Sequence, residues 1–361
     1  MNKYNLKCKK YIYMKKLFLI VILFQLYIFI YYIISGNNIL IKLSEFRNIL
    51  KQRDCSFSIS QVDDDLLFNE AVNQKYLFQQ EFFCRNQILL NNTLIEERIK
   101  VAKVRFDDET FEMFVYKRND FISNEISLKG VWEYKDSKIL FSALHYYSNK
   151  KKITNKETYV LDLGANIGWY SLVLGKQGYN LISFEPSKIN YYILLKNYCL
   201  NSDINMTIIN KGLDINENKS TLYHPLANIG DAIEYNNEQK IDLYNYMKEE
   251  IVLTKLSNYI AYLSSKNLAL LKIDVEGSEC KAIEGGIDLI VKYHIPFIFM
   301  EWNSGLLKSK CSDLKSFLEL FENNGYKISK IDFLSRQYCS INDIINIDLI
   351  NIYIVYTKFL E

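Results

Sequence analysis

The sequence predicts an α/β fold with a doubly wound, mostly parallel seven-stranded sheet in its C-terminal part. Three observations favour this fold. From about residue 151, apolar runs of strand length alternate with helical segments, a glycine-containing turn follows the first run, and acidic residues end several of the runs. Such alternation is typical of parallel strands joined by crossover helices, and ligands of these sheets bind at the carboxyl ends of the strands.

The individual elements follow from the pattern of apolar residues. The expected strands are YVLDLG (159–164), LISFEP (181–186), MTIINKG (206–212), LALLKID (268–274) and PFIFMEW (296–302). We expect helices near residues 168–177, 187–199, 254–264, 278–292 and 311–324. Two later runs, YKISKID (326–332) and LINIYIVYTK (349–358), fit an antiparallel pair at one edge of the sheet.

The N-terminus predicts a membrane segment. Residues 17–34 are apolar or aromatic except for Gln25, a length that crosses a bilayer as a helix. Residues 1–16 contain several lysines and no acid, so this end stays cytosolic and the rest is lumenal, as in a single-pass type II protein of the endoplasmic reticulum or Golgi. The alternative is a signal peptide cleaved near Ser35 and Gly36, which would give a secreted protein.

Three further regions follow this segment. Residues 35–100 are expected to form a stem or cap. In residues 101–150, apolar and polar positions first alternate with period two, which predicts a hairpin, and a helix follows the sequence GVWE (130–133). Residues 151–361 then form the main domain.

Charge and cysteine content exclude some functions and leave others open. The net charge of +2 provides no basic field for nucleic acid, so no nucleic-acid partner is expected. The cysteines have no zinc-type spacing, and no metal site is predicted. An even number of cysteines would be lumenal, which permits disulfides without requiring them: Cys55, Cys84, Cys199, Cys280, Cys311 and Cys339.

The turn after the first strand has the sequence DLGANIG. Asp162 ends the strand, and Gly164 and Gly168 allow the backbone to approach a ligand closely. A dinucleotide fingerprint would need further glycines where Asn166 and Trp169 stand, so a pyrophosphate is disfavoured. S-adenosylmethionine has no phosphate, and its cationic end suits the carboxylate of Asp162. The turn therefore favours a methyl donor over a dinucleotide.

An acid at the end of the second strand strengthens this interpretation. Glu185 can accept hydrogen bonds from both ribose hydroxyls of a nucleoside. Pro186 and Ser187 then begin the next helix and are expected to line the cofactor site on the side of the adenine ring.

The sequence resembles the FkbM family of S-adenosylmethionine-dependent methyltransferases over roughly its last two thirds. The motifs that carry the resemblance are LDLGANIGWYSL (161–172), FEPS (184–187) and above all LLKIDVEGSECKAIEGG (270–286). The resemblance implies a class I, Rossmann-like methyltransferase that methylates a hydroxyl of a glycan, lipid or small molecule. It also implies that the cofactor is held by Asp162, Gly164, Asn166, Gly168 and Glu185. One departure is ANIGD (227–231), where family members often carry a more glycine-rich stretch.

Three further carboxylates are candidates for catalysis. Asp274 ends the fourth strand beside the first, and Glu276 follows in the turn, so both are expected to face the cleft. Glu301 ends the next strand on the same side. Each could bind the acceptor or remove its proton. The alternatives are helix N-terminal carboxylates for Asp274 and Glu276, and a packing role for Glu301.

The sequence also allows other interpretations. His224 is the histidine placed to reach the cleft, although a surface position is the more common outcome for such a residue. A membrane-anchored glycosyltransferase would also fit the topology but needs a strand-ending Asp-x-Asp, which we do not find. A methyltransferase fold that only binds a ligand is the non-enzyme alternative. The oligomeric state is not predicted.

Overall fold

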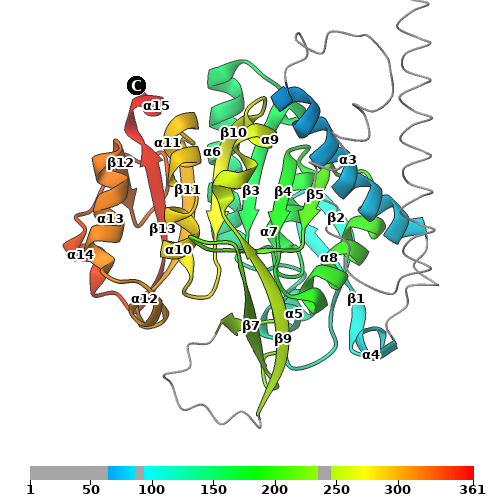
Figure 1. Cartoon of the computed structure of the whole chain (residues 1–361). Coiled ribbons are helices and arrows are strands. Elements are labelled where there is room, and N and C mark those ends of the chain that lie inside the picture. Colours follow the sequence, from blue (N-terminus) through cyan, green and yellow to red (C-terminus); the bar gives the residue numbers. More distant parts are fainter. Residues whose placement is uncertain (1–63, 86–92, 235–244) are drawn as a thin grey trace, which may run out of the picture. The chain divides into compact units, whose positions relative to one another are not determined.

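The computed structural model describes residues 64–85, 93–234 and 245–361 (Figure 1). The predicted cytosolic end (1–16) and membrane segment (17–34) lie outside these residues. Among the residues that the structure does describe, no helix is both long and apolar enough to cross a bilayer.

The central sheet has seven strands in the order β12-β13-β11-β10-β3-β4-β5. Neighbouring strands from β11 to β5 are parallel, and β13 is antiparallel to both β11 and β12. The predicted α/β fold with a mostly parallel sheet and an antiparallel pair at one edge is confirmed. The strands are β3 (Thr158–Leu163), β4 (Asn180–Phe184), β5 (Met206–Ile209), β10 (Asn267–Ile273), β11 (Phe297–Asn303), β12 (Tyr326–Ser329) and β13 (Leu349–Tyr356).

Helices cover both faces of the sheet, because successive strand residues point to opposite sides. In β3, Val160 packs in one hydrophobic cluster and Leu161 in the other. The Val160 face is covered by α6 (Tyr134–Lys151), α7 (Trp169–Lys176) and α8 (Lys188–Leu200). The Leu161 face is covered by η3 (Leu256–Tyr259), α9 (Ile260–Leu263), α10 (Glu279–Glu284), α11 (Ile287–Tyr293) and α13 (Leu314–Asn323).

One predicted helix is broken in the structure. The expected helix over residues 278–292 is two helices, α10 and α11, separated by Gly285 and Gly286. The backbone is crowded at this point, since a Cβ atom on Gly285 would lie 2.3 Å from the carbonyl oxygen of Asp214. The chain therefore turns between two short helices where a single helix was expected.

The predicted hairpin shares its core with the main sheet. It consists of β1 (Ile99–Phe106) and β2 (Glu109–Tyr116), preceded by α4 (Thr93–Glu96) and followed by α5 (Phe121–Lys129). Val104 and Met113 are fully buried in the same cluster as α6, α7 and α8.

The helix α3 (Asp64–Arg85) covers the free edge of β5. The amide of Gln80 donates from Nε2 to the carbonyl of Met206 at 2.8 Å and accepts from the N–H of Ile208 at 3.1 Å. A disulfide between Cys84 and Cys199 joins α3 to α8. A side chain thus satisfies backbone groups that an edge strand would leave unpaired.

A second, four-stranded sheet was not predicted from the sequence. Its order is β6-β9-β7-β8, and Figure 1 shows β7 and β9 beyond the carboxyl ends of the parallel strands. Its polar strands lack the continuous apolar runs that indicate the central sheet. They are β6 (Gly212–Leu213), β7 (Asn218–Pro225), β8 (Ile233–Glu234) and β9 (Tyr246–Thr254).

The remaining short elements are η1 (Asn155–Glu157), α12 (Ser304–Lys310), α14 (Asn342–Ile345) and α15 (Thr357–Leu360). A second disulfide, between Cys280 and Cys311, joins α10 to the residue that follows α12. Cys339 forms no disulfide with another described cysteine, and Cys55 lies outside the described residues.

Candidate functional site

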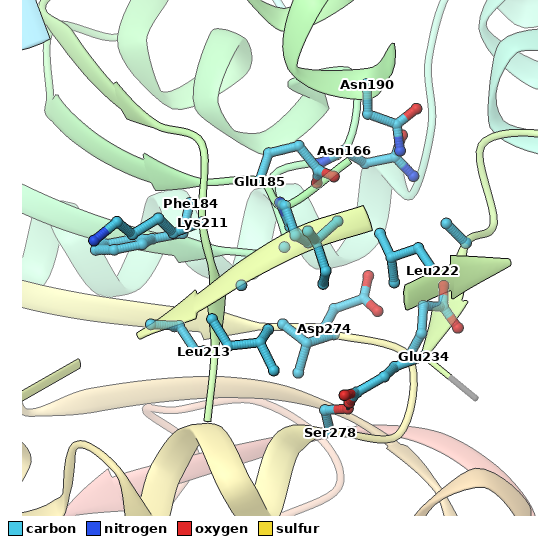
Figure 2. Close-up of a pocket in the computed structure, with 18 of the residues that line it drawn as sticks. Asn166, Phe184, Glu185, Asn190, Lys211, Leu213, Leu222, Glu234, Asp274 and Ser278 are labelled. Atoms are coloured by element: carbon cyan, nitrogen blue, oxygen red, sulfur yellow. The ribbon is translucent and has the colours of Figure 1, made fainter. Parts of the chain in front are cut away.

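A pocket lies at the carboxyl ends of β3, β4 and β10, where the second sheet closes it (Figure 2). Its empty volume is about 710 Å³, including the space open to solvent. The predicted cofactor residues that line it are Gly164, Asn166, Glu185 and Pro186. Asp162, Gly168 and Ser187 do not line the pocket.

The turn after β3 requires glycine. Gly164 has φ +80°, and a Cβ atom there would lie 1.8 Å from the carbonyl oxygen of Asp274. Gly168 has φ +100°, and a Cβ atom there would lie 2.5 Å from Cδ1 of Leu194. Gly164 therefore lets the turn pass close to the strand end of β10, whereas Gly168 lets the start of α7 pack against α8.

Glu185 is 4% exposed and lies at the end of β4, facing the pocket. Its Oε1 accepts from the backbone N–H of Ser187 and its Oε2 from that of Asn166, each at 2.8 Å. Burial raises the pKa of Glu185 to about 7 and outweighs these two hydrogen bonds. Each oxygen keeps a further lone pair, so the carboxylate can still accept from two ligand hydroxyls.

Asp162 is 1% exposed and lies beneath the turn. Its Oδ2 accepts a hydrogen bond from the hydroxyl of Ser171 at 2.5 Å. Its Oδ1 accepts no hydrogen bond from a described residue and lies 3.5 Å from Nζ of Lys272. Oδ1 of this buried carboxylate therefore interacts with Lys272 through charge alone, without a hydrogen bond.

Lys272 is a site residue that the sequence did not predict. Its Nζ donates to the carbonyl of Gly164 at 2.8 Å and lies 3.5 Å from carboxylate oxygens of both Asp162 and Asp274. Burial by itself would lower the pKa of Lys272, but these carboxylates outweigh burial and raise it. The feature of the sequence that could have identified this residue is a lysine within a strand whose neighbouring residues are apolar.

The two acids after β10 have different surroundings. The side chain of Asp274 is 35% exposed, lines the pocket and faces Lys272. Glu276 also lines the pocket and has a left-handed backbone with φ +54°. Burial, the charge of Asp274 and a hydrogen bond with Asp231 raise the pKa of Glu276 well above its usual value. Burial and these neighbours therefore favour the protonated form of Glu276, whereas Asp274 lies in an ion pair with Lys272.

Glu301 lies in β11, outside the pocket lining but facing Asp274. Burial, with the charges of Asp274 and Glu279, raises the pKa of Glu301 to about 8. Glu133, from the GVWE sequence, also faces this group and was not predicted. Its backbone is left-handed (φ +38°), and its Oε2 accepts from the hydroxyl of Tyr170 at 2.5 Å. A second group of acids thus adjoins the pocket beside Lys272.

The loop 228–231 contributes a wall of the pocket. The carbonyl of Gly230 accepts from the side-chain amides of Asn166 at 3.3 Å and Asn190 at 3.2 Å. A Cβ atom on Gly230 would lie 2.2 Å from Oδ1 of Asp120, so a larger residue here would displace that buried side chain. The surface position considered for His224 is wrong, because this residue is 0% exposed.

The chain matches a known protein family at this site. Residues 162–328 match the model described as the methyltransferase FkbM domain. This range covers the turn after β3, Glu185, the second sheet and the acids at the ends of β10 and β11. No curated protein matches the chain.

Solved structures with similar folds include several methyltransferases. The bifunctional kinase-methyltransferase WbdD is 13% identical with a TM-score of 0.39, and the match covers 66% of this chain and 43% of WbdD. Precorrin-6y C5,15-methyltransferase from Geobacter metallireducens is 10% identical with a TM-score of 0.32 and coverages of 63% and 92%. An O-methyltransferase from Bacillus cereus, solved in complex with SAH, is 10% identical with a TM-score of 0.34 and coverages of 62% and 82%.

Proposed function

We propose that this protein, whose residues 162–328 form an FkbM methyltransferase domain, uses S-adenosylmethionine to methylate a hydroxyl group. The observation that carries the proposal is the placement of Glu185 opposite Asp274 in one pocket, with the Gly164 turn between their strands.

The lining of the pocket fits this cofactor. The Glu185 carboxylate can bind the ribose diol, and the apolar side chains of Phe184, Leu213 and Leu253 can flank an adenine ring. Three further acids, Glu234, Asp274 and Glu276, line the pocket, against one lysine, Lys211. Their charge suits a sulfonium and an ammonium and would repel a nucleotide phosphate.

The acids beside Lys272 suggest how the acceptor is activated. S-adenosylmethionine supplies a methyl carbon bound to a positively charged sulfur, which is open to in-line attack. We assign the removal of the hydroxyl proton to the Glu301 carboxylate, so the acceptor oxygen can form its bond to carbon as the carbon–sulfur bond breaks. Asp274, held by Lys272, would orient the acceptor. The acceptor class remains a glycan, lipid or small-molecule hydroxyl.

The proposed ribose contact is tested by Glu185→Ala. We expect the full-length protein to bind S-adenosylmethionine in calorimetry, and the variant to bind it about 1.5 to 3 kcal/mol more weakly, the scale of hydrogen bonds to a charged group. Because only the ionised carboxylate accepts from both hydroxyls, wild-type affinity should fall as the pH drops through about 7. Glu250→Ala, an exposed acid on β9, is the control. Equal affinity of the two variants would remove the ribose assignment.

We also propose that the protein is a single-pass type II membrane protein, attached through residues 17–34, with the domain in the lumen of the secretory pathway. The apolar segment and the preceding lysines support this topology. The Cys84–Cys199 and Cys280–Cys311 disulfides support it too, because such bonds persist in oxidising compartments.

The disulfide between α3 and α8 should stabilise the fold strongly. Its cysteines are 115 residues apart in sequence, and for loops near this length the chain-entropy model gives about 4 to 5 kcal/mol. Cys84→Ser with Cys199→Ser should lower the free energy of unfolding by about this amount in urea denaturation, whereas Cys339→Ser, the control, should have little effect. A double variant as stable as the control would indicate that this bond does not form.

A further inference from the structure

His224, on β7, is enclosed between the loop 228–231 and β9. Its Nδ1 lies 2.9 Å from the carbonyl oxygen of Ile229, and its Nε2 lies 2.9 Å from Oε2 of Glu249. A carbonyl oxygen only accepts hydrogen bonds, so Nδ1 must carry a proton.

The hydrogen bonds of Glu249 decide whether the other ring nitrogen carries a proton. Its Oε1 accepts from the backbone N–H of Lys188 at 2.5 Å, and its Oε2 accepts from the hydroxyl of Ser187 at 3.1 Å. Both carboxylate oxygens of Glu249 thus act as acceptors, and Oε2 is the acceptor that faces Nε2 of the ring. Both nitrogens of His224 therefore donate, and a ring that donates twice is an imidazolium cation.

The two partners of the ring belong to two walls of the pocket. Glu249 holds the first residues of α8, next to the Ser187 N–H that binds Glu185. Ile229 precedes Gly230, whose carbonyl holds the amides of Asn166 and Asn190. Figure 2 shows Glu185, Asn166 and Asn190 together on one side of the pocket. The ring thus connects the loop 228–231 to the strand end that carries Glu185.

We propose that the His224 imidazolium is a positioning residue for cofactor binding, which fixes the loop 228–231 to the start of α8. When the ring loses a proton, one of its two hydrogen bonds is lost and the loop is no longer held against the Glu185 side. The role rests on the proposed function, because it concerns the affinity of the same pocket for S-adenosylmethionine.

The groups around the ring set the direction of the pH dependence. Burial lowers the pKa of His224, but hydrogen bonds to Glu249 and Ile229, with the charges of Glu249 and Glu185, outweigh burial and raise it. Lys188 directs its ammonium to the carbonyl of Glu250. The cation that the two hydrogen bonds require is therefore lost as the pH rises through this raised pKa. Affinity should fall there, opposite in direction to the loss caused by protonation of Glu185.

Calorimetry of the full-length protein with S-adenosylmethionine from pH 6 to 9 tests this role. The wild type should show two declines in affinity, an acid one from Glu185 and an alkaline one from His224. His224→Gln should bind roughly tenfold more weakly at neutral pH, because one charged hydrogen bond is lost. This variant should keep the acid decline and lack the alkaline one. A variant that retains the alkaline decline would overturn the proposal.

A second variant separates positioning from simple loss of packing. In Glu249→Gln, the side-chain amide can donate to Nε2 of a neutral ring while Nδ1 still donates to Ile229. Affinity should stay within a few-fold of wild type, and the alkaline decline should disappear. Persistence of that decline in Glu249→Gln would contradict the role assigned to the ion pair.

The charge of the ring can also be measured without the cofactor. In an NMR titration of protein labelled in its histidines, assigned with His224→Gln, the pKa of His224 should lie above the ordinary histidine value. A lowered pKa would overturn the inference and leave the proposed function intact. A raised pKa together with no binding of S-adenosylmethionine at any pH would instead overturn the proposed function, and with it this role of the ring.

Discussion

Glu301→Gln is expected to lower kcat by about 10²-fold to 10⁴-fold, the contribution of a positioned general base. The amide keeps the shape of the side chain but cannot take the proton of an acceptor hydroxyl. KM for S-adenosylmethionine should change little, because Glu301 lies outside the pocket lining. The measurement is methyl transfer from labelled S-adenosylmethionine to the hydroxyl acceptor that a screen of glycans, lipids and small molecules identifies.

The pH profile of the same reaction separates a base from a packing residue. With a pKa of about 8, Glu301 becomes competent as the pH rises through that value, so wild-type kcat should rise there. The rise should be absent in Glu301→Gln and present in Glu319→Gln, an acid on α13 that serves as the matched control. Unchanged kcat and an unchanged profile in Glu301→Gln would leave Glu301 with a packing role.

Lys272→Met is expected to destabilise the protein by about 3 to 5 kcal/mol, the cost of removing one partner of a buried ion pair. Methionine has a similar length but leaves the carboxylates of Asp162 and Asp274 facing each other without a cation. Urea denaturation would measure the change. Lys327→Met removes an exposed partner of Glu322 and should cost less than about 1 kcal/mol.

A double variant tests the stated cause of this loss. If uncompensated charge is responsible, Lys272→Met combined with Asp162→Asn should recover part of the lost stability, since a neutral amide no longer needs the ammonium. A single variant as stable as Lys327→Met, or a double variant less stable than Lys272→Met, would show that Lys272 does not hold the two carboxylates in place.

The sequence predicted those parts of the fold and of the site that depend on residues adjacent in the chain. Apolar runs indicated the strands of the central sheet, because a parallel strand is buried on both faces. The DLGANIG turn indicated its glycines, because the left-handed backbone at Gly164 is a local requirement. Glu185 was predicted to face a ligand because it ends a strand, and in the structure it lines the pocket. Its binding role and those of Asp274, Glu276 and Glu301 stay predictions.

Only the tertiary structure decided which charges meet. Lys272 obtains its role from Asp162, which comes from another strand, and His224 from Glu249 across the second sheet. Glu133 lies near Asp274 and Lys272, although it belongs to a segment that precedes the main sheet. The sequence placed Lys272 on a strand, but it indicated neither the strand that carries His224 nor the partners of these residues. The physical reason is that a backbone conformation depends on adjacent residues, whereas the ionisation of a buried group depends on charges and burial brought together by the fold.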